Sequence, residues 1–305
     1  MQEGSRKAIV AAFFANLGIA VSKFVGFLIT GSAGMLAEAA HSLADTGNQA
    51  LLMLGGKRSQ QKPTDRHQFG YGNERYFWAF VVALVLFSGG GLFALYEGIQ
   101  KLFHPHRTES VGIAIGILFA AVALESFSLM TAVREVNQVK PAEMSYWRFV
   151  RTAKQPELPI VLLEDVGAEI GLLFALFGLL MAHVTGNARW DAVGSVGIGL
   201  LLMMIASILA VRMKALLIGE SASQSDQDAI VAALTGSAEV ERIIHLRTLY
   251  FGPDELLVAA KLGFAADLTV ADLAQAVDAA EAAVRAALPT VDLIYIEPDL
   301  YRETV

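Results

Sequence analysis

Six stretches of the sequence are long and apolar enough to cross a membrane, and this feature limits the fold more than any other. Crossing roughly 30 Å of hydrocarbon takes about 20 residues of helix. Hydrophobic residues make up 55% of the 305-residue chain and charged residues 17%, a composition typical of an integral membrane protein. We therefore expect six transmembrane helices, at 8–30, 33–56, 76–98, 111–133, 158–184 and 191–212.

Charge is divided unevenly along the chain. Residues 1–219 carry 18 basic and 15 acidic side chains, a net +3, whereas residues 220–305 carry 5 and 15, a net −10. We predict a transmembrane transport domain at 1–219 and an acidic, water-soluble domain at 220–305. Neither part has the basic face or run that is typical of nucleic-acid binding, so no nucleic-acid partner is expected.

The last 86 residues show the pattern of a small α+β domain. Helices are expected at 225–236 and from Thr269, a good N-cap, to about 287, with strands at 241–250, 255–264 and 291–297. This αββαβ order predicts a ferredoxin-like or metallochaperone-like domain, with one antiparallel sheet and the helices on one face.

Basic residues in the loops predict the orientation of the chain in the membrane. With the N-terminus inside, 14 lysines and arginines fall on one side of the membrane and three on the other, Lys101, Arg107 and Arg189. Because positively charged loops stay in the cytoplasm, both termini are expected there. The first apolar segment is longer than the hydrophobic region of a signal peptide, so we interpret it as a span.

The second predicted span carries a polar face. Glu38, His41, Asp45 and Asn48 follow the spacing of one helix face. Ionisable groups in a membrane are costly and usually face a bundle interior or a water-filled path. His41 and Asp45 lie one turn apart, so an imidazole nitrogen and a carboxylate oxygen can reach one divalent ion. The absence of cysteine excludes thiolate ligands, and we interpret this span as half of a transport site.

Charged residues also occur in the interior of three other predicted spans: Lys23 in the first, Glu125 in the fourth, and Glu164, Asp165 and Glu169 in the fifth. We expect these spans to surround a polar path together with the second. Lys23 is expected to pair with a nearby carboxylate, which would neutralise both groups in lipid. For Glu38 and Glu125 such pairing is preferred to direct metal binding, and Asn48 is expected to form a helix–helix hydrogen bond.

Three motifs carry a resemblance to a known family: AEAAHSLADTGNQ at 37–49, KPTDRHQFGYGNERY at 62–76 and LLEDVGAEIG at 162–171. With them, the chain resembles the cation diffusion facilitator family of divalent-metal/proton antiporters, which includes the ZnT zinc transporters. The loop and fifth-span motifs look closest to the branch that includes the animal mitochondrial zinc transporter. The resemblance implies a homodimeric transporter and not an enzyme, with the C-terminal domain serving dimerisation.

The resemblance also implies a tetrahedral metal site between the second and fifth spans. Its ligands would include His41, Asp45 and Asp165. The family often has a histidine one turn before that aspartate, where this chain has Val161. Glu169, one turn further on, is the expected replacement, while the adjacent Glu164 and water stay open as alternatives.

Two further family sites look incomplete in this sequence. Asp65 and His67 lie where many members have an interfacial metal site, but Tyr71 stands in place of its second histidine, so a second site is not favoured. His245 is the only histidine of the C-terminal domain, and Tyr295 stands where a regulatory zinc cluster would have one.

The expected mechanism is alternating access, in which deprotonated ligands take up the ion and protons release it on the other side. Zn²⁺ is the expected cargo, with Co²⁺, Mn²⁺, Fe²⁺ and Cd²⁺ as alternatives, and no tightly bound cofactor is expected. A proton-coupled transporter of a non-metal solute and a non-transporting scaffold or sensor stay open. Without an evident organellar presequence, we expect a prokaryotic inner membrane.

Overall fold

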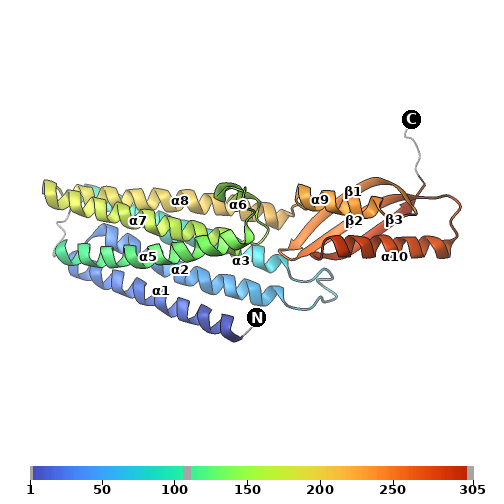
Figure 1. The fold of residues 1–305 in the computed structure, drawn as a ribbon. Coiled ribbons are helices and arrows are strands. Elements are labelled where there is room, and N and C mark those ends of the chain that lie inside the picture. Colours follow the sequence, from blue (N-terminus) through green and yellow to red (C-terminus); the bar gives the residue numbers. More distant parts are fainter. Residues whose placement is uncertain (1–2, 106–110, 301–305) are drawn as a thin grey trace. The chain divides into compact units, whose positions relative to one another are not determined.

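The computed structural model describes residues 3–105 and 111–300, so Arg107 lies outside the described residues. The chain divides into two compact units. The first consists of Met1–Lys57 and Phe77–Lys214, and the second of Arg58–Tyr76 and Ala215–Val305. The first unit is helical, and the second contains the sheet (Figure 1). The domain boundary at 219/220 stays a prediction.

Six long helical segments of the described residues make up the membrane part and run side by side (Figure 1). They are α1 (Glu3–Thr30), α2 (Ala33–Ser59), the continuous run of α3 (Asn73–Val85), η1 (Leu86–Leu92) and α4 (Phe93–Phe103), α5 (Val111–Val139), α7 (Glu157–Thr185) and α8 (Arg189–Ile218). Each segment contains one of the predicted spans. Three of them, the α3–α4 run, α5 and α8, are long and apolar enough by themselves to cross a membrane. The helical membrane fold is therefore confirmed.

The third segment packs closely on α8 through glycines. It includes the π-helical turn η1, with the sequence LFSGGGL. A Cβ atom at Gly91 would lie 2.9 Å from the backbone nitrogen of Met203, and one at Gly98 would lie 2.7 Å from that of Val196. Without side chains at these two positions the backbones can approach each other, which favours helix packing in lipid.

A short helix packs against both α5 and α7, which carry Glu125, Glu164, Asp165 and Glu169. α6 (Tyr146–Thr152) lies in the connection between α5 and α7, and its N-cap Ser145 accepts a hydrogen bond from the Arg148 backbone nitrogen. A small apolar cluster joins α6 to α5 and α7: Phe149, Val150, Val136 and Leu162. The α5–α7 hairpin is therefore fixed at the end where its chain reverses.

The second unit has the predicted αββαβ order. It consists of α9 (Gln224–Thr235), β1 (Val240–Gly252), β2 (Glu255–Phe264), α10 (Val270–Ala287) and β3 (Val291–Asp299), with sheet order β1-β2-β3. β1 and β2 are antiparallel, whereas β2 and β3 are parallel. The prediction of one antiparallel sheet is therefore wrong for β3. The reason is that α10 crosses over between β2 and β3, and such a helical crossover returns the chain in the same direction.

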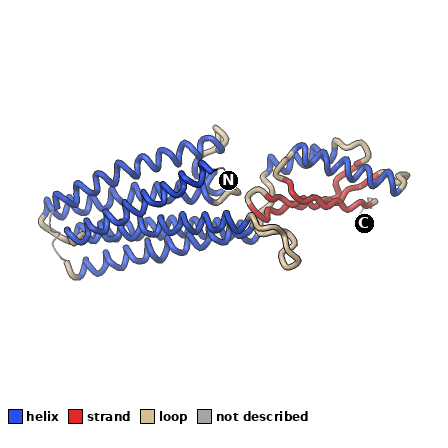
Figure 2. The backbone as a smooth tube through the Cα atoms, turned by 90° about the horizontal axis from the view of Figure 1, so that it is seen from below, coloured by secondary structure: helices blue, strands red, loops and turns tan. Residues whose placement is uncertain are grey.

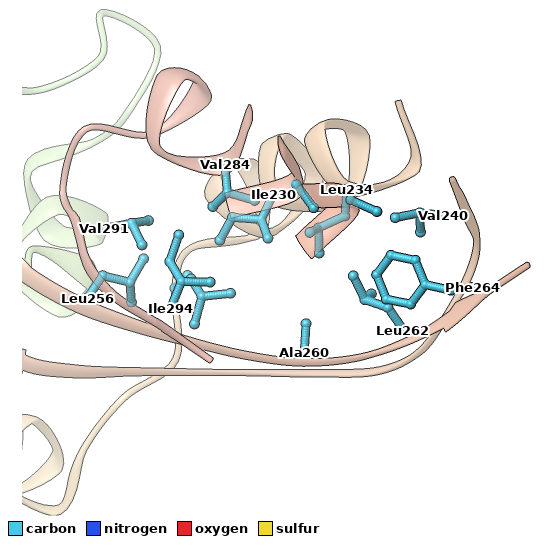
Figure 3. Close-up of a cluster of buried hydrophobic side chains, with 14 of the residues drawn as sticks. Ile230, Leu234, Val240, Leu256, Ala260, Leu262, Phe264, Val284, Val291 and Ile294 are labelled. Atoms are coloured by element: carbon cyan, nitrogen blue, oxygen red, sulfur yellow. The ribbon is translucent and has the colours of Figure 1, made fainter. Parts of the chain in front are cut away.

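Both helices of the second unit lie on one side of the sheet, as predicted (Figure 2). The buried face of β2 shows the alternation of a half-buried strand, with Leu256, Val258, Ala260 and Leu262 inside. Figure 3 shows Ile230 and Leu234 of α9 and Val284 of α10 packed over this face. Thr269 caps α10 by accepting from the Asp272 backbone nitrogen, which confirms the predicted start of that helix.

The loop between α2 and α3 belongs to the second unit. The ring of Phe69 stacks on Phe251 of β1 at 5.0 Å between centroids. Arg75 pairs with Asp254, in the turn between β1 and β2, at 3.0 Å. A Cβ atom on Gly72 would lie 2.7 Å from the Phe251 carbonyl oxygen, so the loop lies directly against this hairpin end.

Candidate metal transport site

The polar face of α2 is buried in the bundle. Glu38, His41 and Asn48 have no exposed surface, and the side chain of Asp45 is 16% exposed. A helix places residues three and four apart on one side. Because polar groups are costly when they face lipid, this whole side of α2 faces the interior of the bundle. The prediction that these residues share a buried face is confirmed.

His41 and Asp45 form the centre of this face. The Nδ1 atom of His41 lies 3.4 Å from the Oδ1 atom of Asp45. Within the described part of the chain, the two ring nitrogens of His41 have no hydrogen-bond partner, and the Oδ1 atom of Asp45 has none either. Buried polar atoms are normally paired. Unpartnered nitrogen and oxygen atoms at this spacing are therefore well placed to receive a bound ion.

A pocket opens beside Asp45, between α2 and α7. Its lining comes from four helices: Ile19 of α1, Ser42, Asp45 and Gln49 of α2, Glu125 and Ser128 of α5, and Val161, Glu164 and Asp165 of α7. The pocket thus brings carboxylates from three helices to one space. Val161, at the position of the expected family histidine, contributes an apolar wall instead of a ligand.

Three acidic residues of α7, Glu164, Asp165 and Glu169, each accept a hydrogen bond from a neutral donor. Glu164 accepts a hydrogen bond of 2.7 Å from Asn48, and Asp165 accepts one of 3.1 Å from Ser128. Glu169 accepts from Ser126 at 3.0 Å, and its Oε2 atom has no partner among the described residues. The contact from Asn48 joins α2 to α7, which confirms the predicted helix–helix hydrogen bond.

The structure brings the predicted ligands together only in part. Asp45, Glu164 and Asp165 line the pocket, whereas His41 and Glu169 do not. Within residues 3–105 and 111–300, no three histidine or acidic side chains are grouped closely enough to hold one metal ion as they stand. Chelation by this set would therefore need side-chain movement.

Lys23 forms a buried charged cluster next to the pocket. Its Nζ atom lies 2.7 Å from the Ser42 hydroxyl, 3.2 Å from Glu38 and 3.4 Å from Glu125. The expected pairing of Lys23 with nearby carboxylates is confirmed. This cluster joins α1, α2 and α5 through one ammonium group.

A second buried cluster, which the sequence did not indicate, lies where α1 turns into α2. Asp191 of α8 accepts hydrogen bonds from the Ser32 hydroxyl at 2.7 Å, the Ala33 backbone nitrogen at 2.9 Å and Lys101 at 2.7 Å. Lys101 also donates to the Gly31 carbonyl oxygen. Both charged residues stand at ends of apolar segments, where a loop position is the ordinary expectation, so no sequence signal marked them as buried.

The two residues of the second site that the sequence did not favour lie in the loop of the second unit. Asp65 and His67 are both exposed. The ring of His67 packs on that of Tyr71, with 4.7 Å between the centroids. The histidine of this loop is thus engaged with the residue that replaces the family's second ligand.

Comparison with known proteins decides the family. Residues 9–218 match the family described as the cation efflux transmembrane domain, which is more than half of the chain. The chain belongs to the cation efflux family. This match covers every residue of the pocket, and the family resemblance seen in the sequence is confirmed.

Several relatives in the cation efflux family extend over most of the chain. "Proton-coupled zinc antiporter SLC30A9, mitochondrial" of Homo sapiens is 31% identical over 263 residues, which is 86% of this chain and 46% of that protein. "Metal tolerance protein C4" of Arabidopsis thaliana is 28% identical over 267 residues, 87% of this chain and 58% of that protein. This chain therefore spans about half the length of these relatives.

Solved structures of MamM C-terminal domains resemble about a quarter of this cation efflux family member. The nickel form of a MamM C-terminal domain is 22% identical and covers 26% of this chain and 100% of that one, with a TM-score of 0.25.

Proposed function

We propose that the protein exports a divalent metal ion, Zn²⁺ above others, across a membrane in exchange for protons. The observation that carries this proposal is the pocket between α2 and α7, lined by Asp45, Glu164 and Asp165 beside the unpartnered nitrogens of His41. Ionisable groups at such depth mark ion pathways in membrane proteins. The relatives named as a zinc antiporter and a metal tolerance protein support the same proposal.

The proposed ligands are His41, Asp45 and Asp165, with a fourth from α7. The sequence favoured Glu169, but the lining of the pocket supports Glu164, since Glu164 lines it together with the two aspartates and Glu169 does not. Release of Glu164 from Asn48 and a rotation of His41 would complete a four-coordinate shell. One imidazole with carboxylates suits Zn²⁺ or Co²⁺, while the oxygen-rich set also admits Mn²⁺, Fe²⁺ and Cd²⁺.

Proton exchange follows from use of the same side chains for both cargoes. An imidazole and carboxylates bind a metal only in their deprotonated forms, so metal binding releases protons. By linkage, protons arriving on the other side weaken metal binding equally. A site that is exposed alternately to each side therefore exchanges one cargo for the other.

The membrane and the assembly are part of the proposal. The family is one of membrane proteins, and the excess of basic residues in one set of loops supports cytoplasmic termini. The prokaryotic inner membrane and the homodimer through the second unit stay predictions.

The test is metal uptake into proteoliposomes under an imposed pH gradient. Zn²⁺, Co²⁺, Mn²⁺ and Fe²⁺ would be offered separately to the parent, Asp45→Asn, Asp165→Asn and the exposed matched control Asp267→Asn. We expect gradient-driven uptake of Zn²⁺ that either pocket substitution abolishes and the control retains. Uptake of no ion by folded, inserted protein would overturn the proposal and favour a scaffold or a non-metal substrate.

A further inference from the structure

Glu125 of α5 belongs to two neighbouring groups of residues. It lines the pocket together with Asp45, Glu164 and Asp165. Its Oε1 atom also lies 3.4 Å from the Nζ atom of Lys23. The side chain is 13% exposed, whereas Lys23 is almost completely buried. Glu125 is therefore the carboxylate through which the charged cluster of Lys23 meets the pocket.

Lys23 has sufficient partners without Glu125. Its ammonium donates to the Ser42 hydroxyl at 2.7 Å and to Glu38 at 3.2 Å, and the contact to Glu125 is the longest of the three. The fully buried Glu38 neutralises the single positive charge by itself. An ammonium group has three donors, so the Ser42 and Glu38 contacts can persist when Glu125 turns away.

The second carboxylate is then a surplus negative charge at the pocket. Two carboxylates share one ammonium group. Around the pocket, Glu164 and Asp165 accept from the neutral donors Asn48 and Ser128, and Asp45 lies 3.4 Å from the Nδ1 atom of His41. Such a charge in a membrane protein is costly unless a cation compensates it. The fully buried His41, whose two ring nitrogens lack hydrogen-bond partners in the described chain, is an independent sign that a ligand belongs at this place.

We propose that Glu125 is a further ligand of the transported cation and that Lys23 is its counter-ion while the site is empty. This inference rests on the proposed function. When the divalent cation enters, Glu125 exchanges the ammonium group for the metal, and Lys23 stays charged and paired with Glu38. Lys23 then competes with the metal for Glu125 and also repels the cation, so it weakens metal binding.

Equilibrium binding of Zn²⁺ to the purified full chain in detergent tests this exchange. The key variant is Lys23→Met with Glu38→Gln, which removes the ammonium group together with Glu38, its fully buried carboxylate partner, and leaves Glu125 released from Lys23. The second variant is Glu125→Gln, which leaves Lys23 and Glu38 as a balanced pair. Lys57→Met and Glu143→Gln, both exposed, are the matched controls.

We expect opposite effects from the two changes. The double variant should bind Zn²⁺ about tenfold more tightly and Glu125→Gln about fivefold more weakly, both within the usual range of coupling between two linked binding events. Adding Glu125→Gln to the double variant should cost more affinity than it does in the parent, because Glu125 is no longer held by Lys23. The controls should bind like the parent.

The outcomes separate this inference from the proposed function. If the parent binds and transports Zn²⁺ but neither variant changes the dissociation constant, Glu125 has only a structural role and the inference is overturned alone. If the parent binds no Zn²⁺, the proposed function and the inference fall together. If the double variant does not fold, as judged by circular dichroism, the comparison of Glu125→Gln with the parent decides the inference.

Discussion

Neutralising Asp191 should destabilise the protein strongly, although this residue is no part of the proposed metal site. Asp191 is fully buried, its partner Lys101 is 6% exposed, and the carboxylate also accepts from Ser32 and the Ala33 backbone nitrogen. Removing one partner of a buried ion pair costs about 3–5 kcal/mol. Asp191→Asn keeps the shape of the side chain and one acceptor oxygen, so we expect the free energy of unfolding to fall by about 3 kcal/mol, at the lower end of that range.

The assay is unfolding by sodium dodecyl sulfate in mixed micelles, followed by the helical circular dichroism signal. The exposed control Asp267→Asn should stay within about 0.5 kcal/mol of the parent. Adding Lys101→Met to Asp191→Asn should recover about 1 kcal/mol or more, because the unpaired ammonium group is then gone. A parent-like unfolding free energy for Asp191→Asn, or strictly additive single changes, would refute the buried-pair reasoning.

Three further predictions concern the pocket and the second unit. Val161→His places an imidazole in the pocket one turn before Asp165. The preference for Zn²⁺ over Mn²⁺ should therefore rise about tenfold in competition binding, and an unchanged preference would contradict the proposed geometry. Burial, with Asp292 nearby, raises the pKa of Glu255, so the stability of the protein should fall as pH rises from 4.5 through that raised pKa. In thermal unfolding, Glu255→Gln should be more stable than the parent at pH 8 and equal to it near pH 4. Leu262→Ala opens a cavity in the sheet core and should cost about 2–5 kcal/mol in denaturant unfolding of the second unit, whereas a smaller loss would mean that the core collapses around the site.

The sequence predicted the elements well because their signals are local. Apolar runs located all six helical segments, and alternation located three strands and the Thr269 cap. The direction of the last strand was predicted less well. Whether β3 runs parallel to β2 depends on how α10 crosses the sheet, and the residue pattern of a strand does not encode this crossing. The π-helical turn at Leu86–Leu92 was not predicted either, since apolar content is the same in both kinds of helix.

For the site, the sequence indicated the residue types and the faces but not the partners. The pairing of Lys23 and the hydrogen bond of Asn48 followed from the cost of polar groups in lipid. The choice between Glu164 and Glu169 could not be made from an i, i+4 spacing, because the packing of α5 and α2 against α7 determines which carboxylate meets the pocket. Asp191 could not be found at all, because its partners are distant in sequence.

Recording both cargoes at once tests the central claim most directly. Proteoliposomes would contain a pH-sensitive dye and a Zn²⁺-sensitive dye, and Zn²⁺ would be added outside without an imposed pH gradient. We predict that Zn²⁺ uptake drives protons out of the vesicles, so the interior becomes alkaline, and that Asp165→Asn abolishes both signals together. Zn²⁺ uptake with no change in internal pH, or proton movement that persists in Asp165→Asn, would contradict a shared site for metal and protons.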